Sequence, residues 1–219
     1  MLSLTVALGA LCGTVIAFAV ACAPEPAPKT WPAGTVLVMD GEPISEQEVD
    51  TLIEPLLELE AAYTQTHRRR LVLTNVVLPR AFSRARYPEE RIRAREEALT
   101  AQRTVSEGEP PDVFLERLTG NWDVLGLETW ITARGLELGR WSEVIEFGGR
   151  FVLVRVNGRD YNAVAGLENF DIDVASYPYM IRYASLQELY IEGELEIVDP
   201  AWREIVPGFY KYHLRADQP

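Results

Sequence analysis

Residues 136–159 read LELGRWSEVIEFGGRFVLVRVNGR and contain the clearest hairpin pattern in the chain. Two runs rich in β-forming residues, 144–147 and 150–156, are joined by Gly148 and Gly149, a dipeptide that favours a tight turn. The second run is apolar on both of its faces, since valines alternate with bulkier apolar side chains. A strand of this kind belongs inside a sheet that is covered on both sides. The pattern therefore predicts that this hairpin is the centre of the main domain.

Composition and charge narrow the range of functions. The chain of 219 residues is 47% hydrophobic and 25% charged, as in ordinary globular proteins. Its formal net charge of −12 argues against a nucleic-acid partner, because phosphate contacts need a basic surface. The sequence has no zinc spacing, no phosphate-binding glycine loop and no serine-hydrolase elbow. Neither a metal nor another cofactor is therefore expected.

The N-terminal segment predicts export and a membrane attachment. Residues 2–21 are uncharged and mostly apolar, and they end in small residues before Cys22. This segment, 1–22, is similar to a bacterial lipoprotein signal, in which Cys22 is lipidated. It is also long enough for an uncleaved signal anchor, and a soluble secreted form is the third alternative. The Pro-rich residues 23–34 predict an extended tether. All three alternatives place the folded part outside the cytoplasm or at its boundary. The prediction is a membrane-anchored protein of the cell envelope that faces the periplasm.

The segment 35–73 predicts a strand, a turn and a long helix. Ser45 and Glu48 form a capping box, so we expect the helix to begin at Ser45. Apolar residues follow at helical spacing, and Pro55 is expected to kink the helix.

The middle of the chain, residues 74–160, predicts one small domain. A strand is expected over residues 75–78. Pro88 begins a charged helix with acidic residues in its first turn, and a stripe of alanines on this helix suits close packing against a sheet. A second, short helix is expected over residues 113–118, and the hairpin follows.

Several of these patterns resemble parvulin-type peptidyl-prolyl cis-trans isomerases. The sequence GRWS at 139–142, followed by FGGR at 147–150 and the apolar strand, is similar to the closing hairpin of that family. The N-terminal order of strand, turn and helix looks like that of the exported chaperone-isomerases of the SurA and PrsA type. The family usually has a histidine where this chain has Arg150.

The resemblance implies an α+β fold. We expect a small antiparallel parvulin-like sheet with helices packed on it, plus a mainly helical accessory module built from N- and C-terminal segments. Residues 161–219 are expected to pack on the N-terminal module. Within them, residues 162–176 predict a loop, 177–190 a helix, 193–198 an alternating strand and 200–206 a short helix.

The resemblance also implies a set of site residues. The positions of the two family histidines and of its Cys or Asp would correspond to Asn75, Arg150 and Asp123. The remaining candidates, Trp130, Trp141, Ser142 and Phe147, would bind the client. Trp130 and Trp141 would form an apolar wall together with Ile131 and Leu136. Arg150 is permanently charged and cannot act as a neutral imidazole, and Asn75 does not titrate. The implied site is therefore degenerate.

The predicted function follows from this degenerate site. X-Pro bonds isomerise slowly enough to limit folding, so an isomerase accelerates the maturation of exported proteins. The prediction is a membrane-tethered folding factor of the cell envelope that binds unfolded or proline-containing polypeptides, with weak or lost isomerase activity. The alternative is a non-catalytic envelope lipoprotein that acts as a holdase or an assembly scaffold.

Overall fold

The structure is a computed structural model that describes residues 30–57, 63–162, 167–180, 193–208 and 210. The chain divides into residues 1–30 and residues 31–219, and the second unit holds all the elements below. The predicted signal and its Cys22, together with most of the predicted tether, lie outside the described residues. No helix in the described part of the chain is long and apolar enough to cross a membrane.

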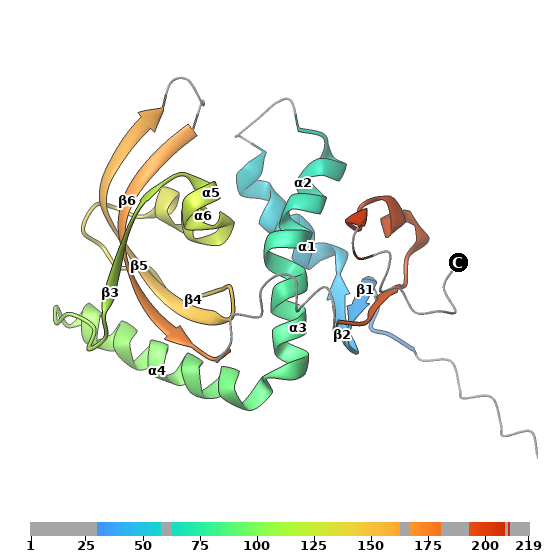
Figure 1. Ribbon diagram of the computed structural model, residues 1–219, viewed down its shortest axis with the longest axis horizontal. Coiled ribbons are helices and arrows are strands. Elements are labelled where there is room, and N and C mark those ends of the chain that lie inside the picture. Colours follow the sequence, from blue (N-terminus) through green and yellow to red (C-terminus); the bar gives the residue numbers. More distant parts are fainter. Residues whose placement is uncertain (1–29, 58–62, 163–166, 181–192, 209, 211–219) are drawn as a thin grey trace, which may run out of the picture. The chain divides into compact units, whose positions relative to one another are not determined.

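Two antiparallel sheets organise the second unit (Figure 1). The smaller sheet has the order β2 (Glu42–Ser45), β1 (Thr35–Met39), β7 (Leu195–Ile197). The larger sheet has the order β3 (Leu115–Gly120), β6 (Leu167–Pro178), β5 (Arg150–Asn162), β4 (Ile145–Phe147). With helices packed on both sheets, the fold is α+β.

The predicted Gly-Gly hairpin is confirmed, with β5 inside the larger sheet and β4 at its edge. Ile145 pairs with Val152, and Phe147 pairs with Arg150 across the Gly-Gly turn. β5 then pairs with β6 along its whole length. Both faces of β5 are buried, since Leu153 on one face and Val152 on the other are each 0% exposed. Two separate apolar clusters form as a result, one on each face of the sheet.

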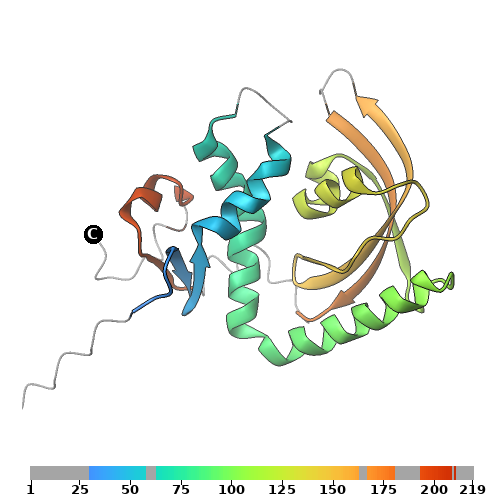
Figure 2. The same ribbon diagram turned by 180° about the vertical axis from the view of Figure 1, so that it is seen from behind.

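Helices cover the two faces of the larger sheet (Figure 2). α4 (Pro88–Ser106) packs on one face, where its alanine stripe, Ala94, Ala98 and Ala101, contacts the cluster of Phe151 and Leu153. α5 (Trp122–Leu125) and α6 (Leu127–Gly135) cover the other face. Small side chains let the helix backbone approach the sheet closely, so the role predicted for the alanine stripe is confirmed.

The N-terminal segment and the chain after β7 share one core. The Oγ atom of Ser45 accepts a hydrogen bond from the N–H of Glu48 at 3.1 Å, which confirms the predicted helix start. The helices here are α1 (Glu46–Ile53), the 3-10 turn η1 (Glu54–Leu56), α2 (Gln65–Val72), the π turn η2 (Leu73–Val77), α3 (Leu78–Arg86) and the 3-10 turn η3 (Pro200–Glu204). β7 pairs with β1, and Trp202 and Ile205 join the core of these helices.

The strand predicted over residues 75–78 is wrong, because these residues continue a helix from α2 through η2 into α3. The π turn ends at Val77, two residues before Pro79, which has no N–H to donate to the helix. Val76 and Val77 are buried in the core with the smaller sheet. Tertiary packing therefore overrides the β preference of these residues.

Two further local predictions are wrong. Residues 113–118, predicted as a helix, include most of β3, and the loop predicted over 162–176 is replaced by the end of β5 and by β6. The predicted domain boundary at residue 160 consequently falls inside β5. The helix predicted over 177–190 begins in the last residues of β6, and most of it lies outside the described residues.

Gly126 provides a test of how tightly the hairpin packs on the helices. Its φ is +79°, and an added Cβ would lie 2.2 Å from Cε2 of Phe147. Gly139 has nearly the same φ, +77°, but open space around it. We expect Gly139→Ala to lower the free energy of unfolding by about 1 kcal/mol through backbone strain, and Gly126→Ala by about 3 kcal/mol through added overpacking. Equal losses in denaturant titrations would contradict this packing.

Candidate functional site

The three predicted catalytic positions do not form one site. Asn75 is exposed on the π turn, and its side chain donates a hydrogen bond to the carbonyl of Leu71 at 2.8 Å. Arg150 donates to the hydroxyl of Ser176 at 3.1 Å. Asp123 is exposed in the first turn of α5. No hydrogen bond or ion pair joins these three described side chains to one another.

The two tryptophans predicted to form one apolar wall belong to opposite faces of the larger sheet. Trp130 is 0% exposed in the cluster under α6, and its Nε1 donates to the carbonyl of Glu168 at 2.9 Å. Trp141 packs against the cluster under α4, with the guanidinium of Arg155 5.0 Å from its ring centre. A client chain cannot contact both side chains on one surface.

Ser142 and Phe147 have structural contacts. The Ser142 hydroxyl is buried, donates to the carbonyl of Glu143 at 2.6 Å and accepts from the N–H of Val154 at 2.9 Å. It thereby ties the segment before β4 to β5. The Phe147 ring fills the space beside Gly126 and lies under the guanidinium of Arg150, 5.5 Å from ring centre to Cζ.

A cluster of charged residues surrounds the carboxylate of Glu146 on β4. Arg91 of α4 binds it through Nε at 2.8 Å and Nη2 at 2.9 Å. The hydroxyl of Tyr179 donates to the same carboxylate at 2.8 Å, and Nε of Arg80 lies 3.5 Å from it. Arg80 of α3 also forms an ion pair with Glu128 of α6. The cluster thus connects three helices with the hairpin.

The two acids of this cluster have opposite pKa shifts. Burial raises the pKa of Glu128 to about 7, although the charge of Arg80 opposes the shift. Burial also disfavours the ionised form of Glu146, but the hydrogen bonds and charge of Arg91, with those of Tyr179 and Arg80, outweigh it and lower its pKa. An acid with a raised pKa is a candidate proton donor. The hollow beside it, however, has a volume of about 10 Å³, room for at most one water molecule.

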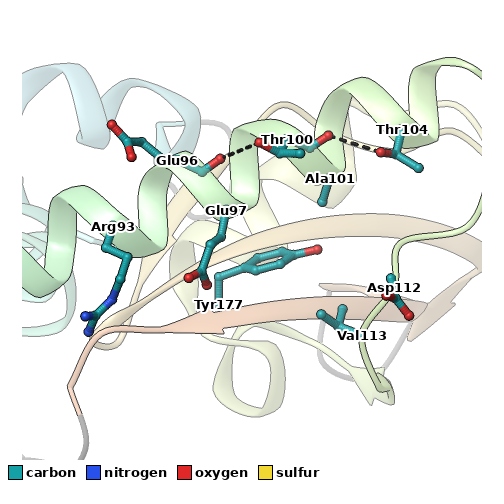
Figure 3. A pocket seen from close by; sticks show the side chains of 9 residues that line it. All are labelled: Arg93, Glu96, Glu97, Thr100, Ala101, Thr104, Asp112, Val113 and Tyr177. Atoms are coloured by element: carbon teal, nitrogen blue, oxygen red, sulfur yellow. Dashed lines mark hydrogen bonds between the residues drawn. The ribbon is translucent and has the colours of Figure 1, made fainter.

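A larger open groove lies between α4, the chain before β3 and β6 (Figure 3). Its volume is about 520 Å³, within the usual range of ligand pockets. The groove is lined by Arg93, Glu96, Glu97, Thr100, Ala101, Thr104, Asp112, Val113 and Tyr177. Ala101, Val113 and the ring of Tyr177 supply apolar surface, and the acids stand at the rim.

Tyr177 is the polar group that this groove leaves without a partner. The residue is 6% exposed, and its hydroxyl is buried with no hydrogen-bond partner among the described residues. Figure 3 shows the hydroxyl pointing along the groove beneath Ala101. A buried hydroxyl without a partner is destabilising, so such groups are rare in folded proteins. Burial raises the pKa of Tyr177, and the charges of Glu97 and Asp112 raise it further, so the hydroxyl stays protonated.

Comparisons with protein-family models, with curated proteins and with solved structures find no match. The parvulin resemblance therefore stays a prediction, as do the roles that it implies for the site residues. The described part of the chain brings no three His, Cys, Asp or Glu side chains together in a way that could hold a metal ion.

The sequence patterns did not identify Glu97, Asp112 and Tyr177, which the structure brings together in the groove. Glu97 lies in a run of charged residues on α4 and looks like part of a solvated face. Asp112 follows two prolines directly before the segment predicted as a short helix, and Tyr177 lies in a segment predicted to be helical. Only the pairing of β6 with β3 and β5, which is long-range in sequence, brings Tyr177 under α4.

The raised pKa of Glu128 predicts how stability depends on pH. The folded protein keeps this proton up to about pH 7, whereas the unfolded chain releases it near 4.5. The unfolded state therefore binds fewer protons in this window, and the free energy of unfolding falls as pH rises through it. In the wild-type protein we expect the free energy of unfolding to decrease by about 3 kcal/mol between pH 4.5 and 7 because of this group. In Glu128→Gln this decrease is expected to be absent. Denaturant titrations across this pH range measure both.

Glu146→Gln is the matched control, because the contribution of Glu146 to stability changes with pH in the opposite direction to that of Glu128. The lowered pKa of Glu146 contributes stability that is present above about 4.5 and lost as pH falls through its folded pKa. Its replacement is expected to destabilise the protein at neutral pH and to flatten the loss in acid. A slope between pH 4.5 and 7 that is the same in wild type and Glu128→Gln would contradict the shift assigned to Glu128.

Proposed function

We propose that the protein is a membrane-tethered folding factor of the cell envelope that binds extended segments of exported polypeptides in the groove beside α4. The observation that carries the proposal is the unpaired, buried hydroxyl of Tyr177 on the floor of this groove. A bound segment that supplies a hydrogen-bond partner would remove the cost of leaving that hydroxyl unpaired. Membrane attachment is part of the proposal and relies on the apolar segment 1–22 and Cys22.

The shape and lining of the groove favour a polypeptide ligand. The groove is open to solvent, so a chain can pass through it without a large rearrangement (Figure 3). Ala101 and Val113 offer apolar surface for one or two client side chains.

The geometry favours binding of polypeptides without prolyl isomerisation over catalysis of isomerisation. Isomerisation requires a pocket that holds the proline and stabilises the rotated amide. Asn75 is hydrogen-bonded to its own helix, and Arg150 is bonded within the sheet. The hollow that Asn75 lines is too small for a proline ring. The proposal therefore favours the non-catalytic alternative, a holdase or scaffold.

Blocking the groove tests where client segments bind. Thr100 is exposed and lines the groove, so Thr100→Trp adds a large side chain at the groove without disturbing the core. Ser106 lies nine residues after Glu97, two and a half helical turns away and thus on the opposite side of α4. In fluorescence anisotropy with labelled unfolded peptides and the full chain in detergent, we expect Thr100→Trp to weaken binding at least tenfold and Ser106→Trp to leave it unchanged. Equal affinities for all three proteins would reject the groove.

The rate of prolyl cis-trans exchange distinguishes a non-catalytic binding protein from a prolyl isomerase. We expect the exchange rate of a short Ala-Pro peptide, measured by NMR exchange spectroscopy, to be the same with and without catalytic amounts of the folded protein. The reason is that the hollow lined by Asn75 is too small for a proline ring, and Arg150 is hydrogen-bonded to Ser176 within the sheet. Acceleration that disappears in Arg150→Ala would restore the isomerase prediction.

A further inference from the structure

We propose that the groove beside α4 recognises a lysine side chain of the client, whose ammonium group binds the hydroxyl of Tyr177 and is attracted by the charges of Glu97 and Asp112. This inference rests on the proposed function, because it specifies which segments that groove selects. It makes client choice depend on one cationic residue within an otherwise apolar segment.

The charges around the groove favour a cation. Glu96, Glu97 and Asp112 line it, against the one lining cation Arg93. Figure 3 shows Glu97 and Asp112 on opposite sides of the Tyr177 ring, one from α4 and the other from the chain before β3. An ammonium group near that ring would therefore be attracted from both sides. Among the described residues, no salt bridge involves Glu96, Glu97 or Asp112.

The surroundings of the Tyr177 hydroxyl favour a ligand group that donates a hydrogen bond over one that carries a negative charge. Because Glu97 and Asp112 lie near it, a carboxylate or phosphate ligand would be repelled from the same place. A lysine ammonium has three N–H donors and no acceptor. It is a compact charge that can donate to the phenol oxygen while both carboxylates attract it, whereas the guanidinium of arginine is planar and its charge is delocalised.

The apolar part of the groove fits the rest of a lysine side chain. Lysine buries its methylene groups along apolar surface while its charged end stays near polar groups. Ala101, Val113 and the Tyr177 ring provide such a surface leading to the hydroxyl. The buried hydroxyl and the acidic rim are thus separate observations that point to the same ligand group.

A matched set of peptides tests the inference. Short labelled peptides of one apolar sequence carry lysine, norleucine, arginine or glutamate at the centre, and they are titrated against the full chain in detergent by fluorescence anisotropy. We expect the lysine peptide to bind about tenfold more tightly than the norleucine peptide, and more tightly than the arginine peptide. The glutamate peptide is expected to bind most weakly. The preference for lysine is expected to decrease at high salt, because rim charges are screened.

Variants of the groove assign the contacts. Tyr177→Phe removes only the hydroxyl, so it is expected to keep or raise thermal stability while weakening lysine-peptide binding about fivefold. Glu97→Gln and Asp112→Asn are each expected to weaken it about threefold, and none of the three variants is expected to change norleucine-peptide binding. Glu89→Gln makes the same change in net charge at an exposed position of α4 that does not line the groove, and we expect it to have no effect.

The outcomes separate this inference from the proposed function. Equal affinities for the lysine and norleucine peptides, both lost in Thr100→Trp, would overturn lysine recognition while leaving segment binding intact. No binding of any peptide would overturn both. Dimerisation of the full chain that Thr100→Trp abolishes, seen by analytical ultracentrifugation, would show that a second copy occupies the groove and would also overturn lysine recognition.

Discussion

The arrangement of the helices depends on the hydrogen bonds and ion pairs made by the carboxylate of Glu146. It lies on β4 and is bound by Arg91 from α4, by Tyr179 from the residue after β6, and by the charge of Arg80 from α3. A buried carboxylate is stable only when it is paired, and the loss of one partner leaves an uncompensated charge. The corner between α3 and α4 is therefore held against the hairpin, and the direction of α4 across the sheet follows from it.

The groove is a consequence of how α4 lies on the sheet. Near Ala94 and Ala98 the helix touches the sheet directly, because only methyl groups separate them. Farther along, beside Ala101, the chain before β3 and the ring of Tyr177 form the other wall, and open space remains between them. The same helix thus supplies core packing in one part and the candidate site in another.

Local patterns in the sequence predicted much of this fold, and long-range pairings account for what was missed. The Gly-Gly hairpin, the N-cap at Ser45 and the alanine stripe depend on neighbouring residues, so they could be recognised in the sequence. β3 is a strand because it pairs with β6 across fifty to sixty residues, which no window of sequence displays. The acids of the groove were missed for the same reason, since Glu97 and Asp112 come together only after the helix folds back over the sheet.

The pairing of β1 with β7 has a consequence for the time at which folding can finish. Leu37 lies opposite Ile197, so the small sheet joins parts of the chain that are about 160 residues apart in the sequence. Contacts between such distant residues form slowly, because a long loop must close first. Until Leu195–Ile197 is in place, one edge of β1 and the core beneath it stay uncovered. A protein that is proposed to protect other exported chains would then itself need protection while it emerges.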